Sequence, residues 1–173
     1  ERGVPRKVWF EKSAEFDAAI RDRFASVFEA AAGGRLDAWR DTPLTALALV
    51  IVLDQFPRNM FRGTPRAFSA DQRALTVARH IDQRGFDAAY LPVECAFAYL
   101  PFEHAEDIVM QRQSIALFAK LPRCASSARY LDYARRHHDV VARFGRFPHR
   151  NEILGRASTP AEREFLKQPG SGF

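Results

Sequence analysis

The feature that most constrains this chain is an almost unbroken apolar run from Leu44 to Leu53. Thr42 and Pro43 precede it, and a hydroxyl residue followed by proline is typical of a helix start. The run is about half of the ~20 residues that a membrane-spanning helix needs, so we expect no membrane association. A helix that is apolar nearly all round has to be enclosed by other elements. We therefore predict that this helix is central to the core.

The rest of the chain repeats apolar residues at helical spacing, and no segment alternates as a half-buried strand would. Glycines and prolines separate the helical segments, and two segments begin with the capping-box pattern, at Ser69 and at Thr159. Ser126 or Ser127 could cap another. The predicted helices are 16–32, 42–56, 69–84, 92–99, 102–121, 126–144, 148–154 and 160–168.

This pattern predicts an all-α fold of seven or eight helices, packed as stacked helical hairpins in a tetratricopeptide-like superhelix. No self-similar repeat of ~34 residues is visible, so the prediction rests on helix pairing alone. A chain of 173 residues suits one domain, which we place at 1–173, with 1–8 as a flexible or truncated N-terminal segment.

Composition narrows the class of protein. Apolar residues make up 47% and charged residues 27%, which is typical of a globular rather than a disordered chain. Cys95 and Cys124 show no disulfide or zinc-ligand spacing, and no signal peptide is recognisable. We expect a cytoplasmic protein without a metal site, and the sequence indicates no particular cofactor.

The formal net charge of +5 comes almost wholly from arginine, which pairs with carboxylates and phosphates through two parallel hydrogen bonds. The densest cluster is the stretch 143–151, with sequence RFGRFPHRN. Pro148 is placed as a first helical residue, which would leave the following amide groups unbonded and able to bind an anion. Arg146 and Arg150 flank these amides. The stretch therefore predicts an anion-binding site.

Three motifs carry a resemblance to a known family: LDQFPRNMFRGT at 53–64, YLPFEH at 99–104, and the segment 143–156. Together they resemble the bacterial DUF924 family, from about Trp9 to Phe173. The resemblance implies an all-α domain of tetratricopeptide-like superhelical type and carries no established activity, so it assigns no catalytic residue. The chain departs from the family pattern in lacking an aromatic N-terminal segment and in having Ala105 where a serine is common.

Polar residues gather at the predicted helix ends, and this indicates a polar pocket for a small anionic ligand, with hydrolase-type acid–base chemistry as an extension. Glu103 and His104 are placed in the first turn of one helix, where both can serve one site. The expected catalytic residues are Glu103, His104, His138 and His149. The expected ligand-binding residues are Asp54, Arg58, Asn59, Arg62, Arg146, Arg150 and Asn151.

Several alternatives stay open. The arginines could instead pair internally with Asp54, Asp71, Glu103 or Asp107 and hold the helices together. A concave face of stacked helices could bind a peptide. Phe144 and Phe147, interleaved with arginines, could stack on single-stranded nucleic acid, although the modest net charge and the lack of a known motif disfavour this partner. The sequence does not decide between an enzyme and a binding protein.

Overall fold

The computed structural model describes residues 3–4, 6–9 and 11–172. These residues form eight α-helices and no strand, so the predicted all-α fold is confirmed. The helices are α1 (Ala14–Ala32), α2 (Pro43–Val50), α3 (Phe56–Met60), α4 (Asp71–Arg84), α5 (Pro92–Glu103), α6 (Ile108–Ala119), α7 (Ala125–Phe144) and α8 (Pro160–Leu166). The tetratricopeptide-like superhelix and the domain limits remain predictions.

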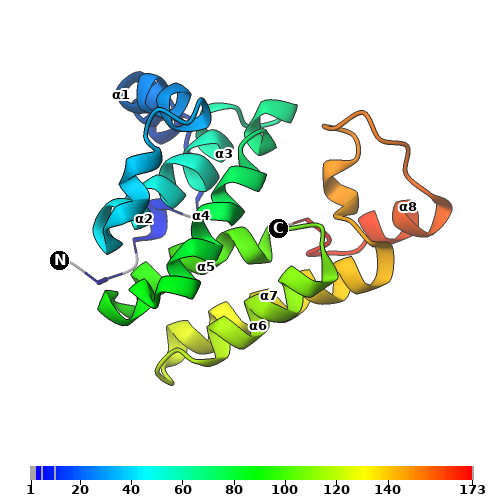
Figure 1. Ribbon diagram of the computed structural model, residues 1–173. Coiled ribbons are helices and arrows are strands. Elements are labelled where there is room, and N and C mark those ends of the chain that lie inside the picture. Colours follow the sequence, from blue (N-terminus) through cyan, green and yellow to red (C-terminus); the bar gives the residue numbers. More distant parts are fainter. Residues whose placement is uncertain (1–2, 5, 10, 173) are drawn as a thin grey trace.

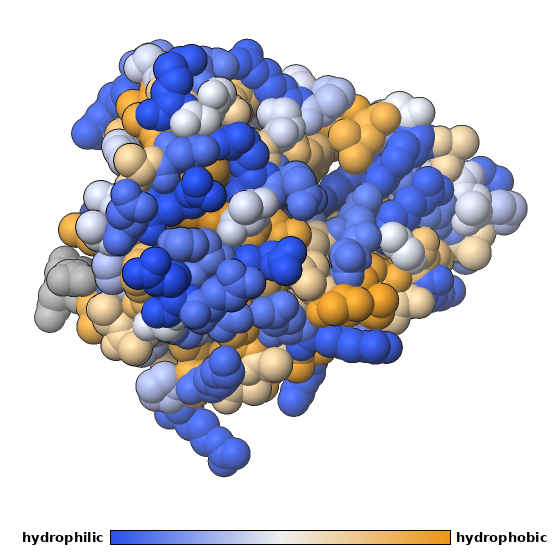
Figure 2. Space-filling model, in the orientation of Figure 1, coloured by the Kyte–Doolittle hydropathy of each residue, from blue (hydrophilic) through white to orange (hydrophobic). Residues whose placement is uncertain are grey.

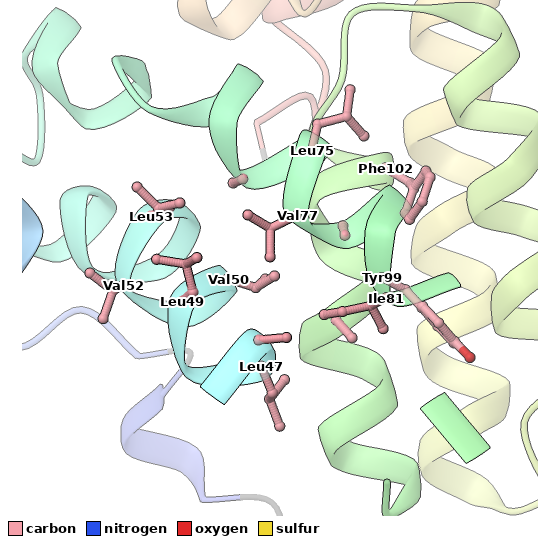
Figure 3. Packing of buried hydrophobic residues seen from close by; sticks show 14 of the residues in the cluster. Leu47, Leu49, Val50, Val52, Leu53, Leu75, Val77, Ile81, Tyr99 and Phe102 are labelled. Carbon is pink, nitrogen blue, oxygen red and sulfur yellow. The ribbon is translucent and has the colours of Figure 1, made fainter. Parts of the chain in front are cut away.

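The apolar run forms the centre of the core, as predicted. α2 continues through a π-helical turn, η3 (Ile51–Gln55), directly into α3, so the chain stays helical from 43 to 60. Apolar side chains of this element pack against those of α4 and α5 (Figure 3). The residues that show this packing in Figure 3 are Leu47, Leu49, Val50, Val52, Leu53, Leu75, Val77, Ile81, Tyr99 and Phe102.

The remaining helices surround this centre (Figure 1). α1 packs on α3, α5 contacts both α4 and α6, and α6 and α7 lie side by side as an antiparallel pair. A smaller cluster of Val140, Val141 and Phe147 lies beyond, with Phe144 and Phe165 against it. It attaches the C-terminal segment with α8 to the end of α7.

The surface is mostly hydrophilic on the face shown in Figure 2, with apolar patches between the charged residues. No helix in the described residues has the length and apolar character needed to cross a membrane. In the described residues Cys95 is a buried free thiol and Cys124 is an exposed one.

The predicted break at Pro101 is wrong. α5 runs from Pro92 through Pro101 to Glu103, and α6 begins only at Ile108. Phe102 is completely buried, so core packing offsets the hydrogen bond that proline removes. The true start of α6 is capped by Asp107, whose carboxylate accepts hydrogen bonds from Val109 N and Met110 N. Glu103 and His104 therefore lie at a helix C-terminus and not in a first turn.

Two predicted helix starts also differ. α4 begins after Ala70 and not after Ser69, because the Ser69 hydroxyl donates to the carbonyl of Arg66 instead of capping the helix. α7 begins after Cys124. Ser127 is the third residue of this helix, and its hydroxyl accepts a hydrogen bond from the N–H of Cys124. The predicted Thr159 capping box is confirmed, since Thr159 and Glu162 exchange the two expected bonds.

The predicted helix 148–154 is shorter than expected. Only a 3-10 turn, η6 (Pro148–Arg150), forms, and hydrogen-bonded turns continue to Gly155. At the other end, residues 1, 2 and 5 of the predicted flexible or truncated segment 1–8 lie outside the described residues. A 3-10 turn, η1 (Lys7–Trp9), follows, and the Trp9 ring meets the ring of Phe97 edge to face at 5.4 Å.

Candidate functional site

A π turn at the centre of the core places a carboxylate in the protein interior. The N–H of Phe56 donates to the carbonyl of Ile51, five residues back, and the next residue, Pro57, has no N–H. Such turns recur at functional sites because they redirect one side chain of a helix. Here the turn carries Asp54, whose side chain is completely buried.

Asp54 is held by three neighbours. His104 Nδ1 lies 2.8 Å from Oδ1, Gln55 Nε2 donates to Oδ2 at 2.5 Å, and Arg58 Nη1 lies 3.5 Å from Oδ1. Burial would raise the pKa of Asp54, but the positive charge of Arg58 and the contacts with His104 and Gln55 outweigh burial and hold it well below its ordinary value. Asp54 is therefore a buried, ionised carboxylate.

His104 has the geometry of a carboxylate-oriented base. Because an ionised carboxylate only accepts hydrogen bonds, Nδ1 carries the proton that binds Asp54, and the lone pair of neutral His104 is on Nε2. No residue in the described part of the chain hydrogen-bonds to Nε2, and the side chain remains 14% exposed. Burial and the nearby Arg58 lower the pKa of His104, against the opposing effect of Asp54, so the imidazole is neutral at pH 7.

Glu103 and His137 form a second buried pair beside the first. His137 Nδ1 lies 3.4 Å from Glu103 Oε1 and donates to the carbonyl of Tyr133 at 2.9 Å. Burial, assisted by Asp54, raises the pKa of Glu103 to about 8, and burial lowers the pKa of His137 to about 3. At neutral pH Glu103 therefore holds a proton while Asp54 does not.

Arg150, from the C-terminal segment, brings a positive charge next to His104. Its Nη1 donates to the carbonyl of His104 at 3.1 Å, and its guanidinium packs against the rings of Phe68 and Phe147. The residue is only 6% exposed, and its Nε has no hydrogen-bond partner in the described residues. Burial and the charge of Arg58 lower its pKa to about 10. Arg150 therefore has an unused donor next to His104.

The carboxylate of Asp71 pairs with both Arg58 and Arg150. Arg58 donates to both of its carboxylate oxygens, at 2.9 and 3.0 Å, and Arg150 Nη1 lies 3.5 Å from Oδ2. Two arginines thus face two aspartates, Asp54 and Asp71, while Glu103 and the imidazoles are neutral. We call the group Asp54, Arg58, Asp71, Glu103, His104, His137 and Arg150 the polar core cluster. It joins η3, α3, α4, α5, α7 and η6 and carries no net charge at pH 7.

Comparisons with known proteins agree with the resemblance that the three sequence motifs indicated. Residues 1–170 match the sequence profile of a family described as bacterial protein of unknown function, DUF924. The chain belongs to the DUF924 family. A solved structure of a protein of unknown function from Agrobacterium tumefaciens is 45% identical, with a TM-score of 0.87 over 93% of this chain and 89% of that one. No curated protein matches the chain.

The structure of this DUF924 protein brings together only some of the predicted site residues. Asp54, Arg58, Glu103, His104 and Arg150 belong to the polar core cluster. His149 lies beside it, with its ring 5.6 Å from that of Phe147, and burial lowers its pKa to about 4. The other predicted residues, Asn59, Arg62, His138, Arg146 and Asn151, have contacts elsewhere.

Asn59 and Arg62 bind one carboxylate on α1. Asn59 Nδ2 donates to Asp17 at 2.8 Å, and Arg62 makes two bonds to the same carboxylate, at 2.8 and 3.0 Å. Arg146 likewise makes two bonds to the buried Glu162, at 2.7 and 2.8 Å. These arginines pair internally and hold helices together, although neither carboxylate was among the partners that we expected.

Asn151 and His138 also have local partners. Asn151 Nδ2 donates to Ser158 Oγ, and its Oδ1 accepts from Arg156 Nε, so this side chain organises the loop before α8. His138 Nδ1 lies 3.1 Å from Asp139 on the outer side of α7. It does not take part in the polar core cluster.

At the predicted anion site, the amides of Arg150 and Asn151 donate to the carbonyls of Phe147 and Pro148, and the amide just before Pro148 binds a carboxylate of the chain itself. Glu106 Oε1 accepts the N–H of Phe147 at 2.7 Å, and Arg156 binds both oxygens of Glu106. Gly145, with φ of 70°, ends α7 and returns Phe147 to the interior, where it is completely buried. Phe147 is therefore not available to stack on a nucleobase.

The sequence reasoning missed His137 and Glu106. His137 lies three positions after Ala134 and four positions before Val141, and both of these residues are buried. The helical spacing of α7 could therefore have assigned His137 to the inner face. Glu106 carried no such signal, because its partners are Phe147 and Arg156, far along the chain. In the described residues, no group of three or more His, Cys, Asp or Glu side chains is arranged to hold a metal ion.

Proposed function

We propose that this DUF924 protein is an acid–base enzyme of the hydrolase type, in which His104 accepts a proton at Nε2 and Asp54 orients its ring. The observation that carries the proposal is the 2.8 Å contact between His104 Nδ1 and the completely buried carboxylate of Asp54. A neutral imidazole fixed in this tautomer keeps a lone pair on Nε2, the ring nitrogen that does not contact Asp54, and a general base requires such a lone pair.

Asp54 and Glu103 support the proposal because their environments separate their protonation states. Asp54 stays ionised and stabilises the imidazolium that forms when His104 takes a proton from water or from a substrate hydroxyl. Glu103, whose pKa is raised to about 8, retains its proton. Two nearby carboxyl groups with opposite protonation states are a recurring arrangement in acid–base catalysis.

Arg150 supports a small anionic substrate. Its guanidinium is fixed by Phe68, Phe147 and the carbonyl of His104, and its Nε is unused. The positive charge of Arg150 acts on His104, so it favours an anionic group at the imidazole, since opposite charges attract more strongly in a low-dielectric interior. When His104 takes a proton from water or a substrate hydroxyl, the total charge of the site and substrate is unchanged, and the new imidazolium lies next to the ionised Asp54.

The test is an activity screen of the purified protein against small carboxylate and phosphate esters and amides. For any substrate turned over, we expect His104→Asn to lower kcat/KM by about 10²–10⁴-fold, the usual contribution of a general base. Asp54→Asn should lower it too, since an amide does not stabilise the imidazolium. The circular dichroism spectrum of His104→Asn should match that of the wild type.

His138→Asn is the matched control, because His138 lies outside the polar core cluster and, in the described part of the chain, has Asp139 as its hydrogen-bond partner. Its kcat/KM should equal that of the wild type. Activity that survives in His104→Asn, or that is lost equally in His138→Asn, would contradict the proposal.

A further inference from the structure

A cavity of about 470 Å³ lies beside the π turn and is lined in part by Ile51 and Gln55 of that turn. It is bounded by α1, α2, the π turn, α3, α5 and the N-terminal turn η1. Four aromatic residues contribute to its walls: Trp9, Phe16, Phe56 and Phe97. Its volume falls in the range of about 300–1,000 Å³ that small-molecule sites occupy, and such sites combine apolar walls with a few fixed polar groups.

The fixed polar groups here are two side-chain amides, Gln55 and Asn59, one helical turn apart. Gln55 Nε2 donates to Asp54 Oδ2 at 2.5 Å, and Asn59 Nδ2 donates to Asp17 Oδ1 at 2.8 Å. Because a carboxylate only accepts hydrogen bonds, each amide is held with its nitrogen toward the protein. Each amide oxygen is then left as an acceptor, and in the described residues neither has a hydrogen-bond partner.

The charged residues of the cavity favour an uncharged ligand. Arg6 and Glu94 both line it, so their charges oppose one another. One oxygen of Glu94 is already engaged, because Oε2 accepts the N–H of Leu91 at 2.9 Å. Aromatic walls with two oriented acceptors and no net charge suit a flat apolar molecule that donates hydrogen bonds.

We propose that this cavity is a second binding site, selective for uncharged aromatic molecules that carry an O–H or N–H donor, with Gln55 and Asn59 as the acceptors. His104 does not line the cavity, so binding there does not require the proton transfer proposed for His104. Gln55 nevertheless bonds to the carboxylate that orients His104, so the two sites share one side chain.

The experiment compares two probes that differ by one methyl group, p-cresol and 4-methylanisole, by isothermal titration calorimetry with the full chain. We expect saturable binding of p-cresol and about tenfold weaker binding of 4-methylanisole, because the ether has no donor for the two amide oxygens. Equal affinities, or no saturable heat with either probe, would overturn the proposal.

Substitutions locate the site. Ile51→Phe places extra volume in the cavity wall and should weaken p-cresol binding at least tenfold, whereas Leu44→Phe, at an exposed position of the same helix, should leave it unchanged. Gln55→Met keeps the side-chain volume but removes one acceptor, and should reduce the preference for p-cresol over 4-methylanisole at least threefold. Wild-type affinity in Ile51→Phe would contradict the assignment.

His104→Asn separates this inference from the proposed enzymatic function. It should bind p-cresol with wild-type affinity, whatever its effect on catalysis. A loss of p-cresol binding in His104→Asn would place the ligand at the polar core cluster and overturn the cavity site. If Ile51→Phe does not fold, the comparison of the two probes on the wild-type chain still decides the proposal.

Discussion

At the scale of single residues, burial decides which polar side chains carry chemistry. His137 and His138 are neighbours in sequence, yet one faces Glu103 in the interior and the other contacts an exposed aspartate. From the sequence, His138 was grouped with Glu103, His104 and His149 as an expected catalytic residue. The helical periodicity of the buried positions in α7 predicts that His137, and not His138, faces the interior.

Glu103 provides the first residue-scale prediction. Its folded-state pKa of about 8 lies above the ordinary value of 4.5, so the folded chain binds one more proton than the unfolded chain between these values. The stability that it contributes is complete below pH 4.5 and is lost as pH rises through 8. Between these two pKa values, the ionisation of Glu103 should therefore lower the free energy of unfolding by roughly 1.4 kcal/mol per pH unit.

Glu103→Gln removes this titration and keeps the shape of the side chain. Between pH 5.5 and 7.5 we expect the wild type to lose about 2–3 kcal/mol of stability relative to the variant, measured by urea unfolding. If the stability difference between the two proteins does not change with pH, Glu103 has an ordinary pKa and the account of the buried pair is wrong.

At the scale of elements, the sequence predicted most helices but not how proline acts in them. One predicted helix ended at 56, just before Pro57, and Pro101 was expected to separate the helices 92–99 and 102–121. In the structure a π turn precedes Pro57 and α5 continues past Pro101, because the buried residues around them pack into the core. Local propensity is a weak guide where tertiary packing is strong.

Arg62 tests the internal pairing between α1 and the turn that follows α3. Arg62→Met should lower the free energy of unfolding by about 1 kcal/mol, since it leaves the carboxylate of Asp17 with fewer donors and the pair is partly screened by water. Chemical denaturation measures this loss.

Lys167→Met is the control, because Lys167 pairs with Glu164 at positions where both side chains are more than 70% exposed. It should change the stability by less than about 0.5 kcal/mol. Equal effects in the two variants would mean that the contact between Arg62 and Asp17 contributes no more than a surface ion pair.

At the scale of the whole molecule, the opposing shifts in the interior predict an optimum of stability. Burial lowers the pKa of His137 to about 3 and that of His149 to about 4. Between these values and the ordinary pKa of 6.5, both side chains bind a proton in the unfolded chain but not in the folded one. Their contribution is lost as pH falls below 6.5, while that of Glu103 is lost as pH rises. The melting temperature should peak near pH 6.5, and a steady rise up to pH 9 would contradict this.

The fold followed from the sequence because helical periodicity and the apolar run at 44–53 are local signals. The site followed only in part. Asp54, Glu103 and His104 were recognised as polar residues at helix ends, but their pairing depends on distances across about fifty residues of chain. The arginines show the same limit: their excess was visible, whereas the partners Asp17, Glu106 and Glu162 were not.

The central claim is that His104 is neutral, with its proton on Nδ1 and a lone pair on Nε2. Nitrogen-15 NMR of the histidine side chains measures this directly, with the His104 signals assigned by their absence in His104→Asn. At pH 7 we predict a protonated Nδ1, an unprotonated Nε2 and a pKa below 6.5 that falls further in Asp54→Asn. An imidazolium at pH 7, or a proton on Nε2, would contradict the account.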